Sequence, residues 1–498
     1  MKGKLPQAFY SPLALLGFAV AGISFGLILF LMTLEFFAHE TKPYMGIIAF
    51  IILPAIMICG LLLVAVALWR EHSLKKRGLA KERRMPVVDL NDPKHRTAVS
   101  MITVVTVLLL VFSAFGSFKA YEYTDSDEFC GTMCHEVMHP EYTAYLNSAH
   151  SRVGCAKCHI GPGADWFVQS KISGAYQLYS VAFNKYSRPI ETPIKNLRPA
   201  QHTCEQCHWP AHFFSEKKVS GNYYLTDEAN TLHSLTMLMK VGGGTATSGT
   251  SNGIHYHMNI ANDIFYYTDD ESRQSIPWIK VIDKEGKEVV YTTKEKAGFT
   301  PPDKELRRFD CIDCHNRPAH IYNQPDKMLN RYMSSGRIDP TLPYIKSIAM
   351  DVLEKDYYTT EEAVKKIDLY ISNFYSASYP DVMKTRQADL AKSIKAIQEI
   401  YSNNYFPTMK VSWKKYPNNL GHMYYEGCFR CHDDKHTSAD GRKISSDCNV
   451  CHTIIGQKIA NEKEMVSLDG MDFIHPSNLN QGIEYNQCPD CHGVYQKN

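Results

Sequence analysis

Two cysteines followed directly by a histidine recur seven times in this chain and use fourteen of its fifteen cysteines. Six copies have the spacing Cys-x-x-Cys-His, and the first copy has one more residue between its cysteines. Numbered in chain order as motifs one to seven, they are Cys130/Cys134/His135, Cys155/Cys158/His159, Cys204/Cys207/His208, Cys311/Cys314/His315, Cys428/Cys431/His432, Cys448/Cys451/His452 and Cys488/Cys491/His492. Two thiols at this spacing can each bond to one vinyl group of a porphyrin, and the adjacent histidine then lies beneath the iron. The pattern therefore predicts seven covalently bound c-type haems, each with a proximal histidine.

Other uses of paired cysteines explain this pattern less well. Structural zinc does not require a histidine after each pair, a disulfide framework would not place one there, and a thioredoxin-like site would occur once. In motif one, Gly131, Thr132 and Met133 separate the cysteines and require a bulge, so a pair of buried thiols is the alternative there. The fifteenth cysteine, Cys59, lies in an apolar stretch and is predicted to be a buried, inert thiol.

Three apolar stretches precede motif one, at residues 13–37, 43–69 and 99–118. Each is long enough, and has few enough charges, to cross the hydrocarbon core of a bilayer as a helix. The first is too long for the core of a signal peptide and lacks a convincing cleavage site, so we expect it to be retained. The sequence therefore predicts a membrane anchor of three helices.

Charged residues around these stretches predict the orientation of the anchor. Residues 70–97 carry nine Lys and Arg against four acidic residues, and Lys2 and Lys4 precede the first stretch. Basic loops stay on the cytoplasmic side of a membrane. Three spans from a cytoplasmic N-terminus would place everything after Phe118 on the periplasmic side of a bacterial inner membrane, where haem is attached covalently. As a topology signal the basic loop needs no further function, and we expect no nucleic-acid partner.

The charge balance outside the anchor predicts the kind of soluble partner. Residues 98–498 carry 42 Lys and Arg against 46 Asp and Glu, and the propionates of seven haems would add negative charge. Opposite potentials speed the encounter of electron-transfer proteins. We therefore expect a periplasmic, lysine-rich c-type cytochrome as partner, while the sequence leaves the oligomeric state open.

The spacing of the motifs divides the chain into four predicted parts. They are a membrane anchor at 1–119 with its cytoplasmic basic loop at 70–97, a tetrahaem region at 120–335 with an insert at 213–305, a helical spacer at 336–408, and a C-terminal trihaem module at 409–498. The predicted fold class is mainly α. It combines three transmembrane helices with a periplasmic multihaem domain that has little regular secondary structure and a small β-hairpin.

Local patterns predict secondary structure in the insert and in the spacer. In the insert, residues 276–282 and 289–293 flank the turn residues 283–286, which predicts the hairpin. In the spacer, Thr359 and Glu362 have the spacing of a capping box. Apolar residues then recur at helical intervals, with Ala363, Val364, Ile367 and Ile371 on a first helix and Leu390, Ile394, Ile397 and Ile400 on a second. We interpret these stripes as packing faces that hold two groups of haems in register.

Each iron also needs a ligand opposite its proximal histidine. The candidates are histidines close to the motifs, namely His139, His150, His202, His212, His320, His422, His436 and His475, together with one of His255 and His257. His139, His212 and His436 each follow a proximal histidine by four residues and cannot close on the same iron, so each would reach a neighbouring haem. Histidine on both sides of an iron leaves no open position for a substrate. Most of these haems are therefore predicted to carry electrons.

Three positions among these ligands are less certain. An extended strand would turn His255 and His257 to opposite sides, so we expect only one of them to ligate. Met133 or Met138 is an alternative ligand for the first haem. His233 is expected to be a surface or core histidine.

From Phe129 to Pro325 the chain resembles the NapC/NirT family of membrane-anchored tetrahaem quinol dehydrogenases. Ser148-Ala149-His150 ahead of motif two resembles the Ser-x-His of that family, and motif four, with His320 five residues after its histidine, resembles the family's fourth motif. The resemblance implies a first haem against the membrane beside a quinol pocket, which Lys171 would help to line.

The chain departs from that family in having three spans instead of one, a long insert before motif four, a C-terminal trihaem extension and the wider motif one. Together with the seven motifs, these features resemble the heptahaem inner-membrane cytochromes of metal-respiring bacteria. The predicted function is that of an inner-membrane menaquinol:cytochrome c oxidoreductase in anaerobic, metal-reducing respiration.

Such an enzyme must handle protons as well as electrons, because quinol releases both. The candidate proton acceptors are Lys171, Asp165, Glu136 and His139. The alternative function is a terminal reductase of a small nitrogen or sulfur compound. It would need one haem with an open position, and the Cys-x-x-Cys-Lys motif of nitrite reductases does not occur in the sequence.

Overall fold

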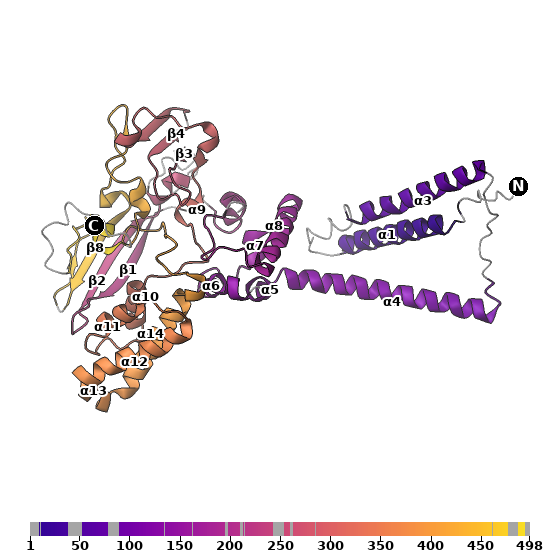
Figure 1. Ribbon diagram of the computed structural model, residues 1–498. Helices are drawn as coiled ribbons and strands as arrows, with labels where there is room; N and C mark the ends of the chain where they lie inside the picture. The colour runs from indigo at the N-terminus through magenta and orange to yellow at the C-terminus, as the bar shows by residue number, and fades with distance from the viewer. Residues whose placement is uncertain are drawn as a thin grey trace. The chain divides into compact units, whose positions relative to one another are not determined.

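The computed structural model places most of the chain in two compact units, one formed by residues 1–126 with 159–178 and the other by residues 127–158 with 179–498 (Figure 1). The residues that the structure describes are 9, 11–37, 52–77, 89–133, 135–161, 163–194, 198–209, 213, 215–242, 253–258, 262–283, 285–460, 462–476 and 487–493. The second unit contains motif one, both cysteines of motif two and all of motifs three to seven.

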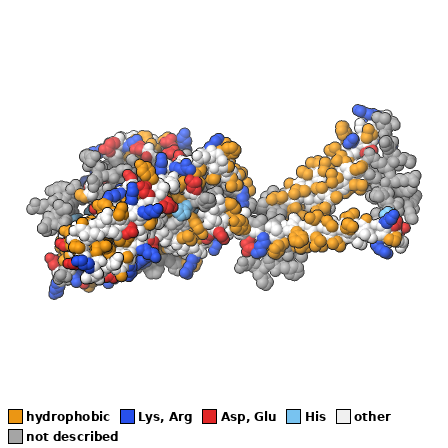
Figure 2. Space-filling view, turned by 60° about the horizontal axis from the view of Figure 1, so that its bottom comes forward, with side chains coloured by type: hydrophobic (Ala, Val, Ile, Leu, Met, Phe, Trp, Pro, Cys, Tyr) orange, Lys and Arg blue, Asp and Glu red, His pale blue; other side chains and the backbone are white. Residues whose placement is uncertain are grey.

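Three long apolar helices make up most of the first unit: α1 (Pro12–Phe37), α3 (Leu53–Lys76) and α4 (Pro93–Thr124). All three are long and apolar enough to span a membrane, which confirms the predicted three-helix anchor. Hydrophobic side chains are exposed along these helices (Figure 2). An apolar surface of this extent is typical of helices that face lipid.

Helices α1 and α3 cross closely because glycine lines their contact. A Cβ on Gly17 would lie 2.7 Å from the carbonyl oxygen of Gly60, and a Cβ on Gly60 would lie 2.8 Å from the backbone nitrogen of Ala21. Small residues let helix backbones approach each other in a membrane. Cys59 is exposed, so the prediction of a buried thiol is wrong. Since neighbouring helical residues point about 100° apart, the contact of Gly60 with α1 turns Cys59 outward.

The helices of the second unit fall into two groups. Short ones carry cysteines or histidines of the motifs: α5 (Asp127–Thr132), α6 (His135–Leu146), α7 (Cys155–His159), α9 (Cys311–Cys314) and α15 (Cys488–His492). After motif two comes α8 (Ala164–Ala182), of which residues 164–178 belong to the first unit. The others form the spacer and the chain before it: α10 (Pro325–Ser334), α11 (Ile345–Leu353), α12 (Thr360–Ser378), α13 (Pro380–Thr385) and α14 (Gln387–Asn404). Single 3-10 turns are η3 (Ala200–His202), η4 (Cys204–Gln206), η6 (Ile254–Met258), η7 (Lys294–Lys296), η8 (Asp303–Glu305), η9 (Pro407–Met409), η10 (Gly427–Arg430) and η11 (Cys448–Val450).

The two helices predicted within the spacer are confirmed as α12 and α14. Thr359 caps α12 by accepting a hydrogen bond from the backbone N–H of Glu362 at 3.1 Å. The return bond of the predicted capping box differs, because the Glu362 carboxylate accepts from the N–H of Tyr358 at 2.7 Å. The predicted apolar stripes meet in one core, where Ile371 of α12 and Ile397 of α14 are fully buried.

Strands from distant parts of the chain form two antiparallel sheets. One has the order β1-β2-β8-β9, with β1 (Glu216–Tyr224), β2 (Leu232–Lys240), β8 (His452–Ile459) and β9 (Met465–Val466). The other has the order β6-β3-β4-β5-β7, with β6 (Arg307–Arg308), β3 (Asp263–Tyr267), β4 (Trp278–Ile282), β5 (Glu288–Thr292) and β7 (Thr437–Ser438). The predicted hairpin is confirmed as β4 and β5, which pair from Trp278↔Thr292 to Ile282↔Glu288.

Both sheets join the insert to the C-terminal module. β2 of the insert pairs with β8, and β5 of the insert pairs with β7. The predicted boundaries of the tetrahaem region, spacer and trihaem module stay predictions, but the insert and the last ninety residues share their sheets. Motif six therefore leads directly into a strand partner of the insert, since η11 ends just before β8 begins at His452.

Candidate haem sites

Each regular motif that the structure describes in full folds as one short helical turn. The backbone N–H of the histidine donates to the carbonyl oxygen of the first cysteine, at 2.8 Å in motifs three and four and 3.0 Å in motif five. One turn of helix places residues three or four apart on the same side. Both sulfurs and the histidine of a motif can therefore meet one porphyrin. In motif one, α5 ends at Thr132 and α6 begins at His135, and Cys134 lies outside the described residues.

In motifs one to four, cysteines of successive motifs lie beside one another. A hydrogen bond with Cys130 and burial raise the pKa of the Cys155 thiol. Burial raises the pKa of Cys158, and so do the nearby Cys204 and Cys207. A hydrogen bond with Cys311 lowers the pKa of Cys204. These sulfurs become thioethers when haem is attached, so their proximity, and not their titration, is what matters. Motifs one, two, three and four are spatial neighbours in chain order.

The same order continues through motif seven. Burial raises the pKa of Cys314 to about 12, and Cys428 and Cys431 of motif five contribute. Burial raises the pKa of Cys451 in motif six to about 11, and Cys428 contributes again. Burial also raises the pKa of Cys488 in motif seven, with a contribution from Cys448 of motif six. The seven motifs therefore form one continuous series.

Four proximal histidines each face a second histidine at nearly the same separation. The ring centroids are 6.0 Å apart for His208 and His150, 5.9 Å for His432 and His257, 6.1 Å for His452 and His422, and 6.1 Å for His492 and His475. An iron–imidazole bond is about 2 Å and the ring centre lies about 1 Å beyond the nitrogen, so two imidazoles across one iron have centroids about 6 Å apart. The described residues thus fit haem iron at motifs three, five, six and seven.

Backbone carbonyls orient several of these rings. The Nδ1 atom lies 3.2 Å from Pro318 O in His150, 2.8 Å from Ile254 O in His257 and 2.9 Å from Ser445 O in His432. A ligand histidine commonly donates its second N–H in this way, which fixes the tautomer and leaves Nε2 for the metal. His320 has the same arrangement, with Nδ1 3.0 Å from Glu141 O. The role of His320 as an iron ligand stays a prediction.

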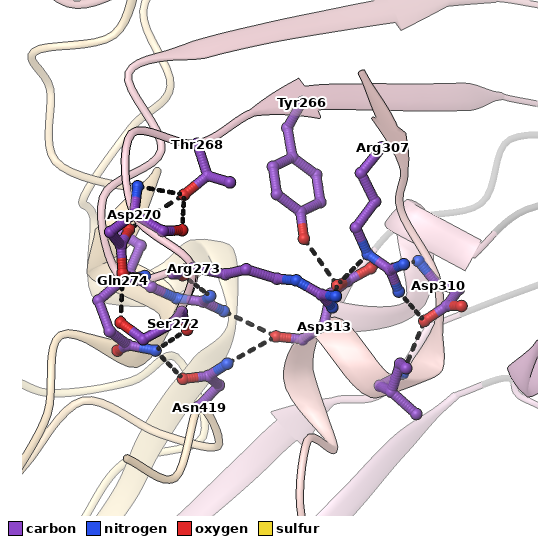
Figure 3. A network of polar contacts seen from close by, with 12 residues as sticks. Tyr266, Thr268, Asp270, Ser272, Arg273, Gln274, Arg307, Asp310, Asp313 and Asn419 are labelled. Atoms are coloured by element: carbon purple, nitrogen blue, oxygen red, sulfur yellow. Dashed lines mark hydrogen bonds and ion pairs between the residues drawn. The ribbon is translucent and has the colours of Figure 1, made fainter. Parts of the chain in front are cut away.

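Asp313, between the cysteines of motif four, lies in a polar network that the sequence did not predict (Figure 3). Its carboxylate is 2% exposed and accepts hydrogen bonds from Tyr266 Oη at 2.7 Å and Arg307 Nε at 2.8 Å, with Arg273 Nη1 at 3.4 Å. A buried carboxylate is stable only when it is paired in this way. Its partners come from β3, β6 and the loop before β4, so the network ties motif four to the insert.

Asp127 is a second site residue that the sequence did not single out. Its carboxylate accepts from Tyr145 Oη at 2.6 Å and from the backbone N–H of Cys155 at 2.6 Å. Burial acts to raise the pKa of Asp127, but these hydrogen bonds outweigh it and the pKa is lowered. Asp127 therefore joins the helix of motif one to motif two as a charged group.

Several predicted iron ligands have other surroundings. His436 is 1% exposed, and both its ring nitrogens are hydrogen-bonded, Nδ1 to Asp433 Oδ1 at 2.8 Å and Nε2 to Ile276 O at 2.7 Å. That arrangement leaves no nitrogen of His436 for an iron and opposes the prediction. His255 and His257 lie on the 3-10 turn η6, so the sequence-based expectation of an extended strand is wrong there.

The remaining predicted ligands lie in varied surroundings. His202 is exposed, and so is His139, whose ring lies 5.3 Å from that of Phe406 in an edge contact. Met138 is half-buried on α6, and His212 lies outside the described residues. His233 is buried, 3% exposed, which matches the expected core histidine.

The four predicted proton acceptors lie on two helices in different units. Asp165 and Lys171 belong to the part of α8 in the first unit, where Lys171 is exposed. Glu136 and His139 belong to α6 in the second unit, and Glu136 Oε1 lies 3.5 Å from Arg188 Nη2. The structure places the two members of each pair on one helix. The grouping of all four at a quinol site stays a prediction.

The three apolar helices and the continuous series of motifs define a membrane-anchored multihaem c-type cytochrome. Residues 92–201 match the N-terminal region of the NapC/NirT cytochrome c family. The chain is 40% identical to the cytochrome c-type protein ImcH of Geobacter sulfurreducens over 487 residues, which cover 97% of this chain and 95% of that relative. No solved structure is detectably similar. The chain belongs to the NapC/NirT cytochrome c family, and as a c-type cytochrome it binds haem covalently.

A pyridine haemochrome assay on the purified protein is expected to give seven haems per chain. Six motifs have the regular spacing, and motif one has Cys130 directly beside Cys155 of motif two, where the next haem is attached. A value of six, with unmodified Cys130 and Cys134 in peptide mass spectra, would show that motif one holds thiols instead.

Proposed function

We propose that this protein is an inner-membrane menaquinol:cytochrome c oxidoreductase of anaerobic, metal-reducing respiration. It takes electrons from menaquinol and passes them through seven haems to a periplasmic cytochrome. The observation that carries the proposal is the continuous series of motifs, which begins six residues after α4 ends and runs in chain order to motif seven. A bound haem supplies one-electron transfer, so neighbouring haems in series act as a wire.

The membrane topology predicted from the sequence supports this direction of flow. The basic residues between α3 and α4 favour a cytoplasmic loop, which leaves motif one at the periplasmic face directly after the last span. A lipid-soluble quinol reaches the protein at that level of the membrane. Electrons therefore enter near motif one.

Quinol oxidation also releases two protons, and side chains near the entry point must accept them. Lys171 and Asp165 on α8, with Glu136 and His139 on α6, are the groups to which we assign this role. Carboxylates, histidine and a neutral lysine can each act as a base near the operating pH. Protonation would neutralise the Glu136 carboxylate and so weaken its ion pair with Arg188.

The proposed soluble partner follows from charge. Residues 98–498 have an excess of acidic side chains, to which the haem propionates add. A lysine-rich c-type cytochrome would be attracted to such a surface and would meet it faster than a neutral protein.

A terminal reductase is the second candidate function, and carbon monoxide binding separates the two. Carbon monoxide binds reduced haem iron that has an open position, and the paired histidines at motifs three, five, six and seven would fill both positions of a bound haem. We expect the dithionite-reduced protein to bind carbon monoxide at none of these four haems. Binding at most of the haems would contradict an electron wire and favour the reductase.

A further inference from the structure

Helix α8 has its apolar side turned outward. Val168, Ile172, Tyr176 and Tyr179 are all exposed, and Ile172 and Tyr176 each keep 67% of their surface open. Phe183 extends the row by one more turn, because its N–H donates to Tyr179 O at 3.0 Å and its side chain is 65% exposed. Intervals of three and four residues place all five side chains along one side of a helix, in a row about 22 Å long. We call these five residues the α8 stripe.

The opposite side of α8 is small and polar. Ser180 is buried, and Ser170, Ser173 and Gly174 are half-buried. A surface helix of a soluble domain has the reverse arrangement, with its apolar side packed on the core and its polar side in water. An exposed apolar surface of this kind marks a site of contact with a membrane or with another protein.

The composition of α8 distinguishes it from the helices of the anchor. Three described helices are long and apolar enough to cross a membrane, and α8 is not one of them. A helix with one apolar and one polar side lies in the plane of a membrane surface, with its apolar side at the boundary between headgroups and acyl chains. The stripe on α8 therefore fits a helix that lies on a membrane and does not cross it.

The charges around the stripe fit an anionic surface. Residues 166–190 contain three Lys and Arg but no Asp or Glu, whereas residues 98–498 as a whole carry more acidic than basic side chains. Lys185 Nζ lies 4.8 Å from the centre of the Tyr179 ring and donates to its hydroxyl. Tyrosine and lysine are common at the level of lipid headgroups, where a basic side chain meets the phosphates of anionic lipids. A lipid surface therefore suits this helix better than a lysine-rich protein does.

The stripe begins in the same compact unit as the membrane helices. Residues 159–178 group with residues 1–126, which contain α1, α3 and α4. Those three helices expose apolar side chains as lipid-facing helices do. Lipid is therefore already the neighbour of the unit to which the first three residues of the stripe belong.

We propose that α8 lies in the surface of the membrane, with the α8 stripe at the acyl-chain boundary and Lys185 at the phosphates of anionic lipids. The protein then contacts the membrane in two ways, through helices that cross it and through one helix that lies on it. Motif two ends at His159, five residues before α8 begins, so this second contact holds motif two beside the membrane. The inference concerns lipid contact alone and does not depend on quinol oxidation.

Labelling by a phospholipid with a photoactivatable diazirine in its acyl chain tests the proposal on the full-length holoprotein. The protein is reconstituted into nanodiscs that contain phosphatidylglycerol, and mass spectrometry of tryptic peptides locates the lipid adducts. Trypsin cuts after Lys171 and Lys185, so the peptide 172–185 contains four of the five stripe residues. We expect lipid adducts on this peptide.

Two other tryptic peptides are internal controls. The peptide 97–119 comes from the membrane helix α4 and should be labelled. The peptide 367–384 comes from α12 and α13 of the spacer and should not be labelled, although its Leu369 is 61% exposed. A yield on 172–185 no higher than that on 367–384 would overturn the proposal. A covalent link between two copies of 172–185 in place of lipid adducts would also overturn it, because a second copy of the chain would then cover the stripe.

Polar substitutions test the stripe itself. Ile172→Ser together with Tyr176→Ser is expected to lower the lipid adducts on 172–185 at least about fivefold, because binding in the interface scales with buried apolar area. Haem content and the labelling of 97–119 should not change. Leu369→Ser is the matched control and should leave the yield on 172–185 at the wild-type level. An unchanged yield in the double variant would show that lipid reaches this peptide without the stripe and would contradict the proposal.

The lipid composition tests the role of charge. Replacing phosphatidylglycerol with phosphatidylcholine should lower the yield on 172–185 in the wild type, while the yield on 97–119 stays the same. The cause is the loss of the attraction between Lys185 and anionic headgroups. An equal yield on 172–185 in the two lipids would overturn the role given to Lys185. All these readouts are measured without quinol, so a failure of quinol oxidation would leave them unchanged.

Discussion

A chain with both Cys488→Ala and Cys491→Ala is expected to accept electrons from quinol normally but to reduce a soluble cytochrome at least about tenfold more slowly. These changes remove only the haem of motif seven, which is last in the series because Cys488 lies near Cys448 of motif six. The exit would then move to an earlier haem, and the partner would have to approach a surface that it does not normally meet. Stopped-flow mixing with a lysine-rich cytochrome measures the rate.

The control for this experiment is the haem content, which should fall by one haem per chain. Quinol should still reduce the remaining haems. Raising the salt concentration should slow transfer to the partner in the wild type, because salt screens attraction between charged surfaces. Truncating the chain before Met409, which removes the whole C-terminal module, would be a poorer test. Val411 and Trp413 of that module are buried in the helical core, and its strand β8 pairs with β2. Full-rate transfer by the double cysteine variant would place the exit at an earlier haem.

The Lys171→Ala variant is expected to lower the rate of reduction by quinol by about 10²-fold, the usual effect of losing a general acid or base. The same should hold for Asp165→Asn. Reduction by dithionite should not change, because dithionite needs no proton acceptor and no quinol pocket. Comparing the two reductants on one preparation therefore separates loss of the quinol site from damage to the haems.

Gln177→Ala is the matched control, because Gln177 is an exposed residue of the same helix whose side chain donates to Ser173 Oγ at 3.3 Å. Quinol and dithionite should each reduce the haems of the Gln177→Ala protein at the wild-type rate. Equal quinol rates for Lys171→Ala and Gln177→Ala would remove Lys171 from the quinol site.

Features that depend on nearby residues could be predicted from the sequence. The three membrane helices follow from long apolar stretches, and the hairpin of β4 and β5 follows from a short turn between strand-forming residues. The N-cap at Thr359 depends on residues three apart. Each of these signals lies within one element or two adjacent ones, where local pattern is sufficient.

Features that join distant segments could not be predicted in the same way. β2 pairs with β8 across more than two hundred residues, and no local pattern identifies a strand partner so distant in the chain. His436 has the spacing expected of a ligand, but its ring nitrogens are taken by Asp433 and by Ile276 of the insert. The sequence could not decide whether His255 or His257 is an iron ligand, because the 3-10 turn that sets the directions of their side chains has no clear sequence signal.

The partners of Asp313 illustrate the same limit on local pattern. The sequence shows an acidic residue within motif four, a position that is exposed in many short helical turns. Burial of this carboxylate depends on Tyr266, Arg273 and Arg307, which reach it from three separate segments. Such a network forms only after the insert has folded against the motif.

Anaerobic titration of the purified, detergent-solubilised protein with a menaquinol analogue tests the central claim most directly. The analogue is chosen with a reduction potential below those of the haems. Each quinol gives two electrons and each haem takes one. We therefore predict that the haem absorbance will show full reduction when half as many quinols as haems have been added. The reduction should be fast in the wild type and slow in Lys171→Ala. A protein that dithionite reduces completely, but that no menaquinol analogue reduces at any concentration, would contradict the account.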